Sequence, residues 1–72
     1  MRILIVEDEA PLRASVAERL RAEGFTVDEA GDGEEGLYFG QEFSPDVAII
    51  DLGLPGLPGM DLIRRLRADG AA

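Results

Sequence analysis

The sequence predicts an α/β fold in which strands and helices alternate to build a doubly wound parallel sheet. Two short, largely apolar runs, Arg2–Val6 and Val47–Ile50, are typical of strands that are covered on both faces. Segments with a helical spacing of apolar residues lie between the strands, and the links are short. The predicted order is β-α-β-α-β-α, with the right-handed crossovers of parallel strands.

The first three elements are predicted within the first 30 residues. Arg2–Val6 predicts a strand that ends abruptly in acidic residues. A helix is predicted over residues 10–23, because a proline stands near its start, a glycine follows it, and apolar residues recur four positions apart, namely Leu12, Val16 and Leu20. Alternating apolar and polar residues over Phe25–Ala30 predict a half-exposed edge strand.

The last three elements begin after a turn at Gly31-Asp32-Gly33. A helix is predicted over Glu34–Phe43, although its glycines, Gly36 and Gly40, each cost about 1 kcal/mol relative to alanine. The run Val47–Ile50 predicts the third strand, and Gly53–Gly59 must form a loop. A third helix, extending up to Asp69-Gly70, is predicted from the spacing of Met60, Leu62, Ile63 and Leu66.

The composition excludes several classes of chemistry. The 72 residues carry 15 acidic side chains and 7 basic ones, all arginine, so the net charge is −8. Without cysteine or histidine the chain has no disulfide, no thiolate zinc site and no imidazole base. Its acidic surface disfavours contact with nucleic acid or anionic membranes, and with neither a signal peptide nor a membrane span we expect it to act in the cytoplasm.

Acidic residues follow the first and third predicted strands. In the flavodoxin-like form of the doubly wound fold the strand order is 2-1-3-4-5, and ligands bind beyond the carboxyl ends of strands one and three, where the order reverses. We therefore expect Glu7, Asp8 and Asp51 to converge in one crevice. Their like charges call for a cation, and an all-oxygen site suits Mg²⁺.

A purely structural explanation competes for some of these acids. Asp8 and Glu9 could serve as the cap and first-turn acids of the helix that follows. Asp51 is harder to explain in this way, because it follows four apolar residues and has no basic residue within ten positions.

The motifs resemble those of the receiver domain of bacterial two-component response regulators over the whole chain. The resemblance rests on Arg2–Glu9, on Ala30–Leu37 and on Pro45–Gly56, and the Glu-Asp-Glu and Ile-Asp-Leu-Gly-Leu-Pro-Gly stretches are most similar to winged-helix regulators of the OmpR and PhoP type. It implies the CheY-like version of the flavodoxin-like fold, truncated to strand order 2-1-3. Residues 1–72 would then be the N-terminal part of a receiver domain, with the remainder of that domain and any effector domain absent.

The resemblance also implies a role for each site residue. Asp51 matches the phosphoacceptor, Asp8 the direct Mg²⁺ ligand, Glu7 an acid that holds the metal through water, and Gly53 the ligand that binds it through a backbone carbonyl. Pro55 matches the proline that shapes the following loop. The phosphoryl donor would be a phosphohistidine on a sensor histidine kinase. The chain would thus be a phosphoacceptor regulator rather than an enzyme, and DNA would be bound only through an absent effector domain that regulates transcription.

Two other functions compete with this assignment. One is an acidic interaction module that is never phosphorylated. The other is a dinucleotide-binding fragment, because Gly31, Gly33 and Gly36 fit the GxGxxG spacing between a strand and a helix. Charge argues against the dinucleotide-binding alternative, because the positions between the glycines are acidic and would repel a pyrophosphate.

Two expectations concern the chain on its own. The resemblance implies that a complete domain adds a Ser or Thr after strand four and a Lys after strand five, whereas these 72 residues contain no lysine. We therefore expect the chain to bind Mg²⁺ weakly and to be phosphorylated poorly. The third strand would also form an exposed edge, so we expect a homo-oligomer that buries the Val47–Leu52 region.

Overall fold

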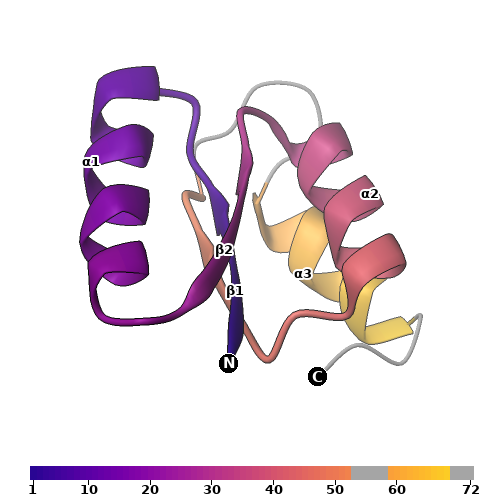
Figure 1. The fold of residues 1–72 in the computed structure, drawn as a ribbon. Coiled ribbons are helices and arrows are strands. Elements are labelled where there is room, and N and C mark those ends of the chain that lie inside the picture. Colours follow the sequence, from indigo (N-terminus) through magenta and orange to yellow (C-terminus); the bar gives the residue numbers. More distant parts are fainter. Residues whose placement is uncertain (53–58, 69–72) are drawn as a thin grey trace.

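The computed structural model describes residues 1–52 and 59–68, which form a three-stranded parallel sheet covered by three helices (Figure 1). The strands are β1 (Arg2–Val6), β2 (Thr26–Ala30) and β3 (Val47–Ile50), and the helices are α1 (Ala10–Ala22), α2 (Gly33–Phe43) and α3 (Gly59–Ala68). The sheet order is β2-β1-β3. The predicted fold class, element order and strand order 2-1-3 are confirmed. None of the helices in the described ranges is long and apolar enough to cross a membrane.

The helices lie in two layers, with α1 on one face of the sheet and α2 and α3 on the other (Figure 1). This arrangement explains why β1 is apolar from Ile3 to Val6, since these side chains alternate between two buried faces. Ile3 and Ile5 pack with Ala17 of α1. Leu4 and Val6 pack on the opposite side.

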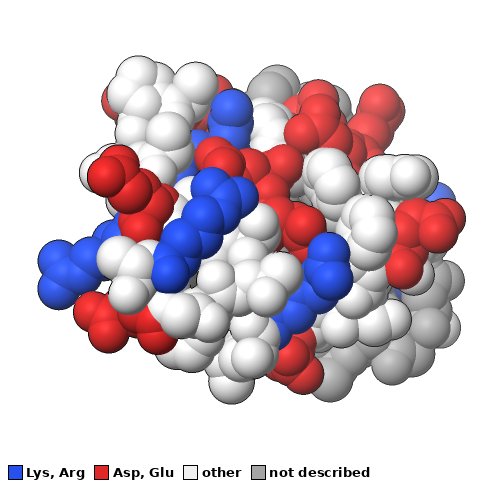
Figure 2. Space-filling view, viewed as in Figure 1, with Lys and Arg blue, Asp and Glu red and all other residues white. Residues whose placement is uncertain are grey.

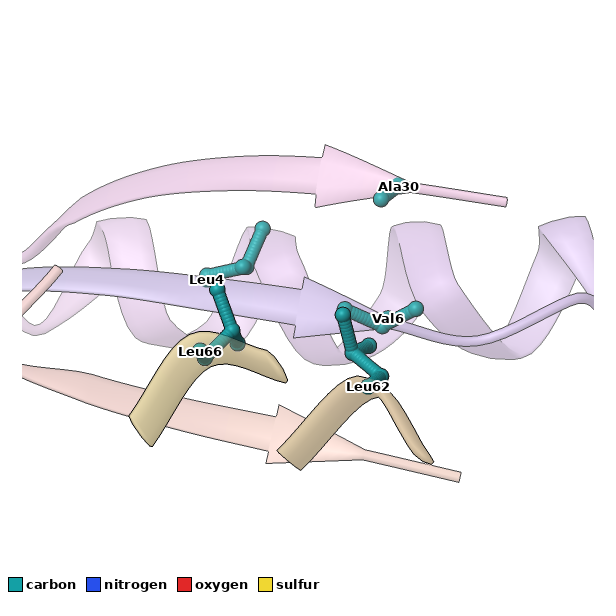
Figure 3. Packing of buried hydrophobic residues seen from close by; sticks show 5 residues of the cluster. All are labelled: Leu4, Val6, Ala30, Leu62 and Leu66. Carbon is teal, nitrogen blue, oxygen red and sulfur yellow. The ribbon is translucent and has the colours of Figure 1, made fainter. Parts of the chain in front are cut away.

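The core on the α2 and α3 side contains the largest fully buried side chains of the described residues. Leu62 and Leu66 of α3 point toward Val6 and Leu4 of β1 (Figure 3). Leu4 and Leu62 are both 0% exposed. The apolar spacing that predicted the third helix therefore corresponds to the side of α3 that faces the core, where Leu62 and Leu66 are buried.

The glycines of α2 are packing residues. An alanine Cβ at Gly36 would lie 2.8 Å from a methyl group of Val6 and 3.1 Å from one of Leu62. A Cβ at Gly40 would overlap the side chain of Leu66. These glycines thus allow α2 to approach β1 and α3 closely, which offsets their low helix propensity.

One packing expectation needs correction. Of the α1 residues predicted to face the core, Val16 and Leu20 pack against it, but Leu12 is 48% exposed because it lies beside β3, where the sheet is not covered. Several acids at positions 28–35 make specific contacts within the fold. Asp28 pairs with Arg2 at 2.7 Å, and Asp32 caps α2 by accepting from the Glu35 N–H at 2.8 Å.

Candidate functional site

The carboxylates of Glu7, Asp8 and Asp51 lie together beyond the carboxyl ends of β1 and β3. One oxygen from each side chain lies within 4.8 Å of the others. The pairing of Val6 with Ile50 in the sheet causes this convergence, because the next residue on each strand is acidic. Glu7 and Asp51 are half-buried, while Asp8 is exposed. The sequence prediction that these three residues converge agrees with this geometry.

The backbone around the site is held by hydrogen bonds from the sheet and from α1. The Asp51 N–H donates to the Val6 carbonyl at 2.9 Å, which extends the β1–β3 ladder by one rung. The Glu7 N–H donates to the Ala30 carbonyl at 3.0 Å, and Arg13 Nη1 donates to the Glu7 carbonyl at 2.8 Å. The acidic side chains therefore project from backbone that is already fixed.

Glu7 has a raised pKa for reasons that lie within the site. The Glu9 N–H, which donates to Glu7 Oε1 at 3.2 Å, acts to lower this pKa. Desolvation, the charges of Asp51 and Asp8, and a hydrogen bond with Asp51 act in the opposite direction, and together they raise the pKa of Glu7 above its ordinary value of 4.5. The three carboxylates thus lack enough nearby positive charge to balance their mutual repulsion.

The raised pKa of Glu7 predicts a pH dependence in metal-free solution. Between pH 4.5 and the raised pKa the folded protein binds more protons at Glu7 than the unfolded chain does, so this contribution to stability falls as the pH rises through that window. Thermal unfolding can be measured in EDTA at several pH values. The Tm of Glu7→Gln minus the Tm of wild type should increase as the pH rises. A constant difference would contradict this assignment.

The donor set fits Mg²⁺. The ion prefers hard oxygen ligands at about 2.1 Å in octahedral geometry, which places ligand atoms about 3 to 4 Å apart, and it keeps several waters. Carboxylate oxygens within 4.8 Å of one another can reach such positions directly or through a bound water. A divalent cation would also relieve the repulsion that raises the pKa of Glu7.

Helix capping does not explain the acids before α1. Glu9, rather than Asp8, occupies the N-cap position, and its side chain makes no capping hydrogen bond. Gly53 and Pro55, which the resemblance assigns to metal coordination and loop shape, lie outside the described residues.

The GxGxxG spacing has a structural explanation at each glycine. The backbone of Gly31 lies against the Arg13 guanidinium, Gly33 is buried at the start of α2, and Gly36 packs on Val6. Glu35 accepts from the Gly31 N–H at 3.3 Å and Asp32 accepts from the Glu35 N–H, so these two acids bond within the motif itself. The structure gives this motif a packing role.

Comparison with known proteins identifies the family. The model of the "Response regulator receiver domain" family matches residues 3–72. The chain belongs to this family. The receiver domain family is one of signalling regulators rather than classical enzymes, in agreement with the predicted type of function.

Individual relatives agree with this assignment. The two-component response regulator PhoP of Pseudomonas aeruginosa is 53% identical over 70 residues, which cover 97% of this chain and 31% of that protein. The receiver domain of the hybrid histidine kinase CckA superposes with a TM-score of 0.90 at 42% identity, covering 96% of this chain and 66% of that one. The receiver chain thus spans about a third of the length of this curated relative.

One structural relative contains a metal. The response regulator TrrA of Thermotoga maritima, solved in complex with Mg²⁺ and BeF, superposes with a TM-score of 0.86 at 36% identity, covering 93% of this chain and 58% of that one.

Proposed function

We propose that this receiver chain accepts a phosphoryl group on Asp51 from a sensor histidine kinase, with Mg²⁺ held by Glu7 and Asp8, by Asp51 itself and by the Gly53 carbonyl. The observation that carries the proposal is the convergence of three carboxylates at the switch point of the sheet. In a longer protein that resembles its relatives, the phosphorylated state would control transcription through a DNA-binding domain.

The chemistry required of the chain is modest. The carboxylate of Asp51 attacks phosphorus, an acyl phosphate bond forms, and the bond between phosphorus and the donor histidine nitrogen breaks. Bound Mg²⁺ would supply charge stabilisation for the transferred oxygens. The residues of this chain position the reactants. The Asp51 N–H is held by the Val6 carbonyl, and Glu7 and Asp8 would hold the metal beside the Asp51 carboxylate.

Charge limits the reaction in this chain. A phosphoryl group carries about −2, so with Glu7 and Asp8 the site would hold about −4 against +2 from the metal. The sequence contains no lysine that could supply a further cation. We therefore expect slow and incomplete phosphorylation of the 72 residues.

Phosphorylation of Asp51 can be tested directly on this chain. With acetyl phosphate and Mg²⁺, intact-mass spectrometry should detect a small fraction carrying one phosphoryl group, which hydroxylamine removes. Asp51→Asn should eliminate this fraction, and EDTA should do the same. Asp61→Asn, which removes an acid from α3, should leave it unchanged. Incorporation that persists in Asp51→Asn would contradict the proposal.

Beryllofluoride offers a second readout that does not depend on turnover, because it mimics a phosphoryl group on a carboxylate. Fluorine NMR should show a bound signal for the wild type that requires both Mg²⁺ and Asp51. Binding without Mg²⁺ would argue against the metal site.

The two edges of the sheet differ in a way that bears on self-association. Along β2, Arg21 donates to the Val27 carbonyl at 2.8 Å and to Glu29 at 2.9 Å, so the edge is covered by charge. Figure 2 shows acidic and arginine side chains interleaved over this side of the molecule. By contrast, Val47 and Ile49 of β3 are 42% and 45% exposed. Ile49 also lines, together with Leu12, a groove of about 250 Å³.

We propose that β3 and the adjoining groove pair with a second copy of this chain, which buries the Val47–Leu52 region. Sedimentation of the wild type should show concentration-dependent association, because exposed apolar strand edges pair readily. Ile49→Lys should abolish association, whereas Thr26→Lys on the β2 edge should not. A wild type that stays monomeric at high concentration would overturn this proposal without affecting the phosphoacceptor assignment.

A further inference from the structure

We propose that Arg13 is a positioning residue that holds the Glu7–Asp8 segment in the conformation required for metal binding. This inference rests on the proposed function of the carboxylate site. It extends that function to a side chain on α1 that no sequence motif identifies.

Arg13 joins three segments that surround the site. Its Nη1 donates to the backbone carbonyl of Glu7 at 2.8 Å, and its Nε lies 3.6 Å from Glu29 Oε1 on β2. Its side chain is 22% exposed, compared with 81% for Arg19 on the same helix. Arg13 is therefore partly buried and bound on two sides.

Gly31 provides the space for this arrangement. A Cβ at Gly31 would lie 3.3 Å from Arg13 Nη1, which is tighter than ordinary side-chain contact, and 3.9 Å from its Cζ. The guanidinium group thus lies against the backbone of the β2–α2 link while it also contacts the link after β1.

Electrostatic repulsion creates the need for such a tether. The side chains of Glu7, Asp8 and Asp51 offer carboxylate oxygens within 4.8 Å of one another, so repulsion between their like charges favours a loop that moves the acids apart. The sheet fixes the Glu7 N–H through Ala30, and Arg13 fixes the carbonyl of the same residue. With both backbone groups held, the Glu7 side chain stays directed toward Asp51 before the metal arrives.

A simpler electrostatic role for Arg13 predicts the opposite result. If Arg13 acted only as a nearby positive charge, it would repel Mg²⁺, and its removal would strengthen metal binding. If Arg13 positions Glu7 and Asp8, its removal weakens binding even though a repelling charge has been lost. The sign of the change therefore separates the two roles.

The test is a Mg²⁺ titration of the whole chain followed by backbone amide NMR shifts, a method suited to weak binding. Arg13→Met should weaken binding by roughly 10-fold, the size of effect typical of residues that orient metal ligands. Arg13→Lys should lie between wild type and Arg13→Met, because lysine can still donate to the Glu7 carbonyl. The control is Arg19→Met, which removes an equal charge from the exposed face of the same helix and should leave the affinity unchanged.

Gly31→Ala provides a test that keeps every charge and guards against misfolding of the Arg13 variants. Crowding of the guanidinium should weaken Mg²⁺ binding about 2-fold or more. It should also speed amide hydrogen exchange at Glu9, whose N–H bonds to Glu7 Oε1.

Unchanged or tighter binding in both Arg13→Met and Gly31→Ala would overturn the positioning role while the proposed metal site stands. A wild type that shows no Mg²⁺-dependent shifts at Glu7, Asp8 or Asp51 would overturn the metal site and, with it, this inference.

Discussion

Asp51→Asn should raise the Tm of the metal-free protein and abolish its stabilisation by Mg²⁺. The substitution removes a charge that acts directly on Glu7, so the folded state loses a repulsion that the extended unfolded chain hardly experiences. A ligand that binds only the folded state raises stability by mass action, so Mg²⁺ should increase the Tm of the wild type. Loss of a carboxylate ligand should weaken Mg²⁺ binding by at least about 100-fold, because even residues outside the ligand shell typically contribute 10- to 100-fold.

Differential scanning calorimetry in EDTA and in Mg²⁺ measures both effects of Asp51→Asn. The matched control is Glu18→Gln, which removes one negative charge from the exposed face of α1. This control should keep the response of the wild type to Mg²⁺. If Asp51→Asn lowered the Tm in EDTA, or if Mg²⁺ still stabilised it, the carboxylate cluster would not be the metal site.

Gly36→Ala should destabilise the protein even though alanine is the better helix former. The new methyl group would lie 2.8 Å from Val6, a β-branched residue of the central strand that cannot move without disturbing the sheet. Overpacking of this kind costs about 1–3 kcal/mol, against a gain of about 1 kcal/mol in helix propensity. The Tm should fall by several degrees, since about 1 kcal/mol corresponds to roughly 4–8 °C in a domain of this size.

Gly40→Ala is the internal comparison for Gly36→Ala. Its Cβ meets the end of the Leu66 side chain, which can rotate, so it should cost less. Chemical denaturation of both variants, together with Val6→Ala and the double variant Val6→Ala/Gly36→Ala, gives the coupling directly. A favourable coupling is expected because the smaller residue makes room for the methyl group. Equal stability of Gly36→Ala and wild type would show that α2 is not seated against β1 as described.

Much of the fold could be predicted because local patterns and chain topology agree. Ile3–Val6 of the first strand is apolar on both faces because helices cover both faces, and the acidic residues that follow mark the ligand edge of a parallel sheet. The same topology brought Asp51 beside Glu7 across more than 40 residues of sequence, which motif spacing alone could not do.

Other features depend on tertiary packing that no local pattern encodes. Gly36 and Gly40 looked unfavourable in a helix until their contacts with Val6 and Leu66 were known. Leu12 has the spacing of a core residue but lies beside a part of the sheet that none of the described helices covers. The contact of Arg13 with the Glu7 carbonyl involves a backbone acceptor, which carries no signature in the sequence.

Val6 and Glu7 are neighbours in the chain, yet one belongs to the core and the other to the acidic site. A change in α2 that shifts Val6 will therefore also shift the first acid of the site, although α2 itself contributes no ligand to the carboxylate cluster. Mutational tolerance of the two regions is thus linked. Variants selected only for thermal stability around Gly36 should therefore also differ from wild type in Mg²⁺ affinity. Screens for signalling defects should recover substitutions in α2.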